Sequence, residues 1–326
     1  MNRFSVVQAE SAEQASTAVK DPAVRLSVIK AGGMDVVDHL KEGLESPDRL
    51  VNILPVTESQ MRRIERGHIG ALTTLAQIAD SPTMQREAPV IAQACGSAAT
   101  PQVRNVATAA GNLLQRPRCW YYRNDQFHCL KKGGHTCYAV EGENEYHAIF
   151  GEGPCHIVHP SNLAPALNVC NGTVHVTGGD RDTIDIKKLF HMPHEGLQSE
   201  HRLEQGEVIT HMTFESRPTS AFYAVKHKQS FDWPLVCAAV ALNLDGDVIR
   251  NAEICAGAVA PIPWRLPDVE KALNDVSVDD EQALKSACER STRAARPMSG
   301  NAYKLRLLPV AIRRAIRKAA GREVEA

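Results

Sequence analysis

The sequence of 326 residues lacks the features that mark nucleic-acid-binding, membrane-spanning or secreted proteins. Its 37 basic and 38 acidic residues leave a formal net charge of -1, so bulk charge predicts neither a nucleic acid nor an anionic membrane as a partner. No run of eighteen apolar residues occurs, so we expect no membrane insertion. The opening stretch, MNRFSVVQAESAEQASTAVK, has no apolar core of a signal peptide, so the cytoplasm is the expected compartment.

The common catalytic and nucleotide-binding motifs are also absent. There is no HExxH zinc motif, no GxSxG nucleophile elbow, no phosphate-binding P-loop and no GxGxxG dinucleotide fingerprint. The 13 histidines are scattered without the spacing of metal ligands. No side chain has the context of a general base, so we predict that this chain carries no catalytic residue of its own.

The remaining pattern is that of an ordinary folded protein of two domains. Apolar residues make up 43% and charged residues 23%, and the length suits two domains. Strand and helix patterns alternate over residues 3–53, which predicts βαβ character, and residues 68–115 alternate helical patches with small-residue loops. A boundary is predicted near 216–220. Residues 269–291 and 308–320 are predicted to be helical, and the second should dock its apolar face on the second domain.

Short local signals predict where several elements begin and end. Ser11 and Gln14 have the spacing of a capping box at the start of a helix. Asp35 near an N-terminus and Gly43 as a stop signal bracket a second helix. Within 221–261, long apolar strands flank the stretch LDGDV, which predicts a hairpin turn.

Two small-residue loops can bring backbone N–H groups close to a phosphate. The stretch IKAGGMD places Gly32 and Gly33 between a strand and a helix, where this is common, although an ordinary turn fits the same residues. In RNVATAAGN, Gly111 allows close backbone approach, and Thr108 and Asn112 can hydrogen-bond a phosphate or ribityl hydroxyls. A tight turn packed under another element is the alternative for this loop.

Four of the 9 cysteines lie within residues 116–155, with the spacing C-x9-C-x7-C-x17-C. In a reducing compartment such a cluster indicates a metal site more than disulfides. There is no CxxC zinc knuckle, yet four thiolates suit either zinc or an iron–sulfur cluster, and spacing alone leaves both open, with unliganded thiols or disulfides as a third alternative. The remaining cysteines lie in small or apolar surroundings and are predicted core thiols: Cys95, Cys170, Cys237, Cys255 and Cys288.

Five stretches, taken in order, carry a family resemblance: KAGGMDVVDHLKEG, IGALTTLAQIA, VRNVATAAGNLLQRPRCWYYR, HPSNLAPAL and KHKQSFDWPLVCAAVAL. Together they resemble the FAD-binding subunits of molybdenum hydroxylases, the superfamily of xanthine dehydrogenase, carbon monoxide dehydrogenase and aldehyde oxidoreductase. The resemblance implies an α+β fold. A PCMH-type, vanillyl-alcohol-oxidase-like FAD-binding domain in two subdomains would span residues 1–218, with a cysteine-rich insertion at about 116–156. An α+β C-terminal domain like that of the carbon monoxide dehydrogenase flavoprotein would span residues 219–326.

The resemblance also implies which residues bind FAD. Met34 stands where the family's AGGT loop has Thr, which removes a hydroxyl but keeps the backbone N–H donors, and Ala110 replaces a Gly of TxGGN. Asn162 replaces the acid of HPSDLAPAL and brings hydrogen bonding without charge. Lys226 or Lys228 matches a basic position near the flavin, where a cation favours the anionic reduced form. The implied FAD-binding set is Lys30, Ala31, Gly32, Gly33, Met34, Asp35, Thr108, Gly111, Asn112, Asn162 and Lys228.

The cysteine segment is most similar to that of the flavoprotein subunits of periplasmic aldehyde oxidoreductases, with 4-hydroxybenzoyl-CoA reductase more distant. This similarity implies a [4Fe–4S] cluster on Cys119, Cys129, Cys137 and Cys155. Nearby cations would offset the negative charge of the cluster and raise its potential. Those cations are Arg116, Arg118, Arg123, Lys131 and Lys132. We interpret His128 and His135 as surface residues.

The function implied by the resemblance is that of an oxidoreductase subunit that transfers electrons. The expected partners are a large molybdenum-cofactor subunit, a small [2Fe–2S] subunit and an external electron acceptor, in a heterotrimer that oxidises an aldehyde or an N-heterocycle. A partner with a twin-arginine signal would carry the folded chain to the periplasm. The alternatives are a free-standing PCMH-type flavin oxidoreductase and a zinc-stabilised binding module without redox activity.

Overall fold

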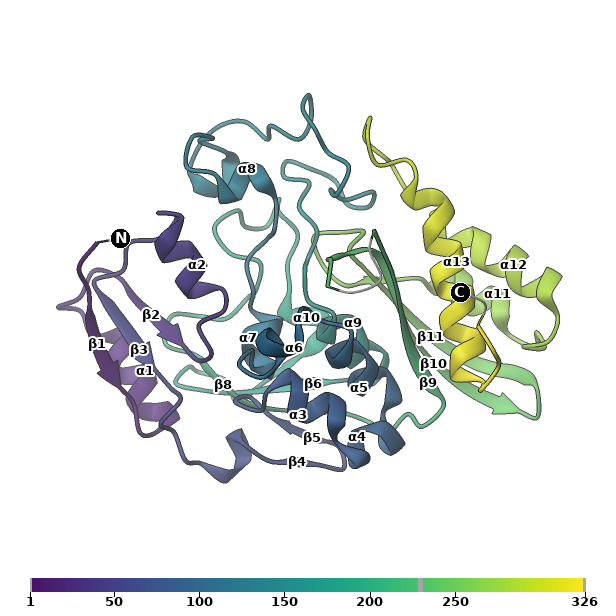
Figure 1. Cartoon of the computed structure of the whole chain (residues 1–326), viewed down its shortest axis with the longest axis horizontal. Coiled ribbons are helices and arrows are strands. Elements are labelled where there is room, and N and C mark those ends of the chain that lie inside the picture. The colour runs from purple at the N-terminus through teal and green to yellow at the C-terminus, as the bar shows by residue number, and fades with distance from the viewer. Residues whose placement is uncertain (1, 228–230, 325–326) are drawn as a thin grey trace.

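The computed structural model describes residues 2–227 and 231–324, and it contains three sheets. The first strands and the last helices lie at opposite sides of the molecule, with a layer of short helices between them (Figure 1). Strands and helices are mixed without regular alternation, so the predicted α+β class is confirmed. No helix in the described ranges is long and apolar enough to cross a membrane.

A parallel three-stranded sheet, in the order β1-β3-β2, forms the first subdomain. Its elements are β1 (Ser5–Gln8), α1 (Ala12–Lys20), β2 (Ser27–Lys30), α2 (Val36–Lys41) and β3 (Arg49–Asn52). Parallel pairing requires crossover segments, so the predicted βαβ character is confirmed. Ser11 Oγ accepts from Gln14 N at 3.1 Å, but the Gln14 side chain accepts from Glu10 N, so only half of the predicted capping box forms.

The second subdomain is a five-stranded sheet in the order β4-β5-β8-β6-β7, packed against short helices. Its strands are β4 (Ile64–Glu65), β5 (His68–Gly70), β6 (Thr173–Thr177), β7 (Thr183–Asp185) and β8 (Val208–Thr213). Its helices are η1 (Ser59–Met61), α3 (Leu75–Asp80), α4 (Pro82–Glu87), α5 (Pro89–Gly96), α6 (Pro101–Arg104), α7 (Ala109–Leu113), α9 (Leu163–Val169) and α10 (Ile186–Leu189). Several begin at a Thr or Ser cap, because a hydroxyl satisfies an otherwise unpaired N–H of the first turn.

The cysteine-rich insertion leaves the second subdomain after α7 and returns to it before α9. It contains little regular structure, namely α8 (Trp120–Arg123) and η2 (Leu130–Lys132), and the rest is turns and loops. In Figure 1 it stands above the sheets, with α8 near its top. A segment with so few backbone ladders depends on side-chain contacts for its shape.

The C-terminal part is an antiparallel sheet, in the order β12-β11-β10-β9, covered by helices. Its elements are β9 (Ser220–Lys226), β10 (Pro234–Asp245), β11 (Val248–Gly257), β12 (Trp264–Arg265), α11 (Pro267–Leu273), α12 (Glu281–Glu289), η3 (Arg290–Thr292) and α13 (Lys304–Ala319). The hairpin at Gly246 and the docking of the last helix are confirmed, since Leu308, Ile312 and Ile316 are fully buried against the sheet. Burying each such side chain contributes about 1.5–3 kcal/mol.

One helical prediction needs correction. Residues 269–291 do not form a continuous helix, because α11 ends at Leu273 and α12 begins only at Glu281. Asp275 adopts a positive φ of 61°, a left-handed conformation that interrupts a helix. The Asp280 side chain then accepts from Ala283 N at 2.9 Å and caps the new helix.

Strand β10 is buried on both faces, and its alternate residues enter two different cores. Cys237, Ala239 and Ala241 belong to the core of the first two subdomains. Val236, Ala238, Val240 and Leu242 belong to the core beneath α13. Because side chains alternate along a strand, a strand between two cores must be apolar throughout, which explains the unbroken run LVCAAVAL.

Candidate functional site

A cavity of about 2370 Å³, open to solvent, lies between the first two subdomains and the start of β10. It is lined by the loop after β2, the loop around α7 and the residues that precede α9. Nine members of the FAD-binding set implied by the sequence line it: Ala31, Gly32, Gly33, Met34, Asp35, Thr108, Gly111, Asn112 and Asn162. Three segments that are distant in sequence therefore meet around one space.

The glycine pair is required by local geometry. A Cβ on Gly32 would lie 2.1 Å from the carbonyl oxygen of Val106, so the two small-residue loops touch at this point. Gly33 has φ +77°, a conformation that glycine adopts without strain. The two glycines thus hold the loops together and leave the backbone of both loops at the cavity surface.

The polar members of the set tie the cavity wall together. Thr108 Oγ1 accepts from Gly111 N at 3.2 Å. Asn112 Oδ1 accepts from Ser161 Oγ at 2.7 Å, which joins α7 to the segment before α9. Asn162 Nδ2 donates to Ser97 Oγ at 3.2 Å. These bonds rigidify the cavity before any ligand arrives, which reduces the entropy lost on binding.

Only one of the two lysines in the implied set lies within the described residues. Lys30 is outside the lining of the cavity, and its Nζ donates to Asn52 Oδ1 at 3.4 Å. Lys228 lies outside the described residues. The alternative basic residue, Lys226, donates to the Ser97 carbonyl at 2.6 Å, and burial lowers its pKa.

Asp35 is the centre of an ion-pair network that joins the glycine loop to the cysteine insertion. Its Oδ1 lies 2.6 Å from Arg118 Nη1 and 2.7 Å from Arg123 Nη2, and its Oδ2 accepts from Arg116 N at 2.6 Å. Burial acts to raise the pKa of Asp35, but the two guanidinium groups outweigh it and hold that pKa below its usual value. The carboxylate therefore stays charged and fixes the start of the insertion.

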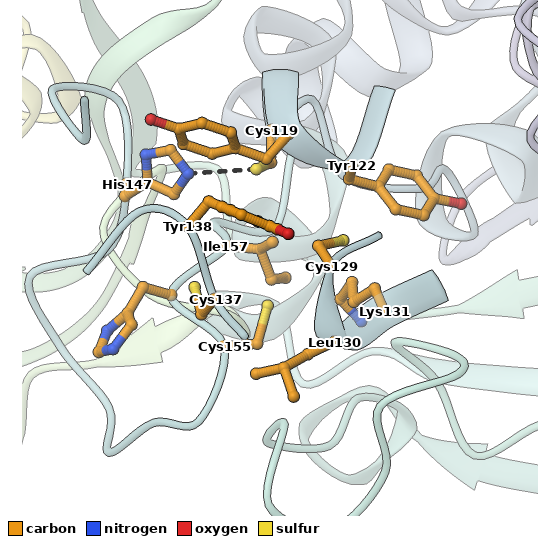
Figure 2. A pocket seen from close by; sticks show the side chains of 12 residues that line it. Cys119, Tyr122, Cys129, Leu130, Lys131, Cys137, Tyr138, His147, Cys155 and Ile157 are labelled. Atoms are coloured by element: carbon orange, nitrogen blue, oxygen red, sulfur yellow. Dashed lines mark hydrogen bonds between the residues drawn. The ribbon is translucent and has the colours of Figure 1, made fainter. Parts of the chain in front are cut away.

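A second cavity, of about 300 Å³, is formed by the insertion itself. Its lining includes the four clustered cysteines, Cys119, Cys129, Cys137 and Cys155 (Figure 2). Cys137 and Cys155 lie side by side, and their mutual interaction lowers the pKa of Cys137 and raises that of Cys155. Burial raises the pKa of Cys119 to about 11. The fold thus brings four cysteines that are widely spaced in the sequence to one cavity.

The other cysteines behave as core thiols, as predicted. Each is buried, and burial raises its pKa: Cys95, Cys170, Cys237, Cys255 and Cys288. All nine cysteines fall in the described ranges, and none of them forms a disulfide there. The disulfide alternative for the insertion is therefore not what the structure contains.

The donor geometry of the cysteine cavity does not suit a single ion. No group of three or more His, Cys, Asp or Glu side chains in the described part of the chain could hold one metal ion. A tetrahedral zinc site brings all its sulfurs to about 2.3 Å from one centre. A four-iron cluster differs in that it carries one thiolate on each of four irons, so its ligands do not share one metal centre.

Of the five cations predicted to offset the charge of a cluster, only Lys131 lines the cysteine cavity. Lys131 is buried, with its Nζ 2.5 Å from Glu200 Oε1 and 3.0 Å from the Leu197 carbonyl. Arg116 is paired with Glu200 at 2.7 Å. Because acids already pair with the arginines, the charge they offer the cavity is smaller than the sequence suggests. His128 and His135 are exposed, as predicted.

His147 is a residue of the cysteine cavity that the sequence reasoning missed. Its Nε2 lies 3.2 Å from Cys119 Sγ, the dashed contact in Figure 2. Burial lowers its pKa to about 4, so the ring is neutral at physiological pH. The sequence held one usable signal, namely that His147 immediately precedes the apolar run AIF in an otherwise polar insertion.

The two cavities are neighbours. Arg118 lines the larger cavity and Cys119 lines the smaller one, and consecutive Cα atoms lie only about 3.8 Å apart. A third hollow of about 1000 Å³ lies between them and shares Trp233 with the larger cavity and His147 with the smaller one. The Arg118 guanidinium stacks 4.8 Å from the centre of the Trp233 ring.

Comparison with known sequences gives two family matches. Residues 2–214 match the FAD binding domain in molybdopterin dehydrogenase, and residues 220–319 match the CO dehydrogenase flavoprotein C-terminal domain. The aldehyde oxidoreductase FAD-binding subunit PaoB of Escherichia coli is 28% identical over 305 residues, covering 91% of each chain. The carbon monoxide dehydrogenase medium chain of Afipia carboxidovorans is 24% identical over 301 residues, covering 90% of this chain and 88% of that one.

Solved structures share the fold. Carbon monoxide dehydrogenase from Oligotropha carboxidovorans matches with a TM-score of 0.76 at 20% identity, covering 99% of both chains. Quinoline 2-oxidoreductase from Pseudomonas putida 86 matches with a TM-score of 0.75 at 20% identity, covering 98% of both chains. Similarity at this level establishes the arrangement of elements, while function must be argued from the site.

Proposed function

Because this chain belongs to the family of FAD-binding subunits of molybdenum hydroxylases, and is a flavoprotein subunit of that oxidoreductase type, we propose a specific electron-transfer role for it. It receives electrons from [2Fe–2S] clusters of a partner subunit and delivers them to an external acceptor, through FAD and a [4Fe–4S] cluster. The complex oxidises an aldehyde or an N-heterocycle. The chain contributes binding, orientation and electrostatics, since the redox chemistry belongs to the cofactors.

The larger cavity is the proposed FAD site, and its glycine loops would hold the pyrophosphate through backbone N–H groups. FAD exchanges one or two electrons when bound. Support comes from the convergence of nine implied residues on one preformed space, and from Gly32 and Gly33, whose missing side chains keep the loops in contact. Thr108 and Asn162 are the side chains that we assign to hydrogen bonds with the cofactor.

The smaller cavity is the proposed [4Fe–4S] site. The single observation that carries this assignment is the convergence of Cys119, Cys129, Cys137 and Cys155 on one cavity that lacks the geometry for a lone ion. The donor set is soft and all thiol, which suits iron–sulfur chemistry. The cluster is a property proposed for this chain, since FAD subunits of this family usually lack it.

Partners are proposed from the family as well. The relatives include a carbon monoxide dehydrogenase medium chain and an aldehyde oxidoreductase FAD-binding subunit, which supports a heterotrimer with a large molybdenum-cofactor subunit and a small [2Fe–2S] subunit. Phe231 and Trp233 are about half exposed beside the larger cavity, and exposed aromatic side chains of this kind suit a subunit interface. The compartment proposed is the cytoplasm, or the periplasm when an exported partner carries the chain.

The test is a pair of cysteine variants in the purified protein. Cys129→Ser should remove the cluster signal from electron paramagnetic resonance of the reduced sample and lower iron content, while FAD absorbance is retained, because the glycine loops lie outside the insertion. Cys288→Ala, which alters a buried thiol beneath α13, should keep both cofactors. Unchanged iron in Cys129→Ser disproves the ligand set, and a colourless wild-type protein with stoichiometric zinc disproves the whole proposal. Copurification with a large molybdenum subunit excludes a free-standing enzyme.

A further inference from the structure

A buried lysine at the start of α13 lines neither the larger cavity nor the cysteine cavity. Lys304 is 1% exposed, and its ammonium donates to three backbone carbonyls. The acceptors are Tyr146 at 3.2 Å, His147 at 2.9 Å and Ala258 at 2.8 Å. These bonds use all three N–H groups of the ammonium. A residue of the C-terminal domain therefore holds the backbone of the cysteine insertion.

Asn301, in the turn before α13, also bonds to the backbone of the cysteine insertion around His147. It is fully buried, and its Nδ2 donates to the carbonyls of His147 and Ala148, each at 3.1 Å. Its Oδ1 accepts from Met298 N at 2.7 Å, which fixes the amide orientation. With Lys304, it constrains the peptide groups on both sides of His147.

Other residues of the segment 144–150, which contains His147, are also attached to the C-terminal domain. Asn144 Oδ1 accepts from Gly300 N at 2.7 Å, and its Nδ2 donates to Ser299 Oγ at 3.0 Å. Ile149 and Phe150 belong to the core beneath α13. The segment 144–150 is thus fixed to the C-terminal domain. Cys119, in contrast, is fixed to the glycine loop, because its neighbour Arg118 pairs with Asp35.

Stability alone does not account for a lysine in this position. Removing an ammonium from water costs several kcal/mol, and apolar replacements of buried charged groups are often neutral or stabilising. Burial lowers the pKa of Lys304 to about 7, which reflects that cost. One of its acceptors, Ala258, has φ 61°, a strained conformation for a residue with a side chain. Such strain tends to be kept where it positions something.

We propose that Lys304 and Asn301 are positioning residues for the cysteine site, acting through His147. They fix the peptide groups around His147 so that its Nε2–H donates to the Cys119 sulfur. A hydrogen bond to a ligand sulfur raises the reduction potential of an iron–sulfur cluster. The C-terminal domain thereby sets the potential of a cluster bound by the other domain. This inference rests on the proposed [4Fe–4S] function.

The experiment is a redox titration of the purified protein, followed by electron paramagnetic resonance of the cluster. Asn301→Leu, a near isostere without donors, and Lys304→Met should both lower the midpoint potential. Lys318→Met is the control, because Lys318 lies on the same helix and its exposed side chain also donates to a backbone carbonyl, that of Phe222. The control should keep the wild-type potential.

A double variant separates positioning from a general structural role. His147→Leu should lower the potential, and adding Asn301→Leu to it should produce no further change, because both act through one hydrogen bond. Additive shifts overturn the inference. So does a wild-type potential in Asn301→Leu and Lys304→Met, even if their melting temperatures fall. If Lys304→Met does not fold, the neutral Asn301→Leu variant still decides the outcome.

The result is distinguishable from a failure of the proposed function. A wild-type protein without iron or a cluster signal refutes the proposed [4Fe–4S] site itself. A wild-type protein with a normal cluster, whose potential is insensitive to Asn301 and Lys304, refutes only the positioning role.

Discussion

The two cavities are built in opposite ways, although a single peptide bond separates their walls. The proposed FAD cavity is lined largely by loops at the ends of regular elements and by small residues, and its polar side chains bond to other residues of the cavity wall. The cysteine cavity is lined by an insertion with almost no regular structure, which ion pairs hold on one side and Lys304 and Asn301 hold on the other. The first site depends on local packing and the second on contacts distant in sequence.

The largest expected effect on FAD content comes from adding one methyl group at the glycine loop. Gly32→Ala would place a Cβ 2.1 Å from the Val106 carbonyl, so the two glycine loops must separate. Overpacking of this kind costs about 1–3 kcal/mol, and we expect FAD content after purification to fall at least tenfold while iron content changes little.

Gly43→Ala is the matched control for this comparison. Gly43 also has a positive φ, of +72°, but nothing lies within 4 Å of its added Cβ. The strain of about 1–2 kcal/mol should lower the melting temperature without loss of FAD. Equal FAD loss in both variants would show that backbone strain, rather than contact between the loops, controls the site.

The next variant, Asp35→Asn, should affect both proposed cofactor sites at once. Asp35→Asn leaves Arg118 without its charge partner and removes one of the two partners of Arg123, in a mostly buried position. Since breaking a fully buried pair costs about 3–5 kcal/mol, we expect a somewhat smaller loss of about 2–4 kcal/mol here, measured by denaturant unfolding. Both cofactors should bind more weakly, and loss of only one would mean that the network does not couple the sites.

Acid should weaken the FAD side of the molecule. Burial lowers the pKa of His159 to about 3 and of His201 to about 4, from an ordinary value of 6.5. The folded state holds both rings neutral, so their stabilising contribution is complete above about pH 6.5 and is lost as pH falls toward 4. The melting temperature should therefore fall over this range.

A single variant tests that assignment. His201 lines the FAD cavity, and His201→Gln should flatten the dependence of the melting temperature on pH between 6.5 and 4. An unchanged pH profile in this variant would assign the acid sensitivity to other groups.

The smallest expected effect lies far from both cavities. Ser11→Ala removes the side-chain acceptor that caps α1, which should cost about 1 kcal/mol. FAD and iron content should not change, and the loss should appear only in the unfolding midpoint. Loss of FAD in this variant would mean that the cavity is less rigid than its internal hydrogen bonds indicate.

Most of what the sequence predicted correctly depends on short-range patterns. Strand alternation, the LDGDV turn, the position of the paired glycines between a strand and a helix, and the apolar stripe of the last helix can each be recognised within a few residues. Each of these is confirmed. The α+β class and the FAD family followed from several such stretches in order.

What the sequence did not predict depends on distant contacts. The partners of Asp35 are more than eighty residues away, and those of Lys304 lie more than a hundred and fifty residues before it, except Ala258. No local pattern specifies such pairs, so Asp35 was assigned to FAD alone and His147 was overlooked. The break after Leu273 was also missed, because Asp275 supplies a left-handed turn that glycine more often signals.

Strand β10, with one face in each core, affects whether the two parts of the chain can be produced separately. A cut between residues 214 and 220 would separate the two regions that match family models. Each fragment, however, would keep one half of a shared apolar surface and expose it to water. Either fragment expressed alone should aggregate or require the other in trans. Gene fission at this junction would thus be viable only when both products are made together, so the two parts are expected to be inherited as a unit.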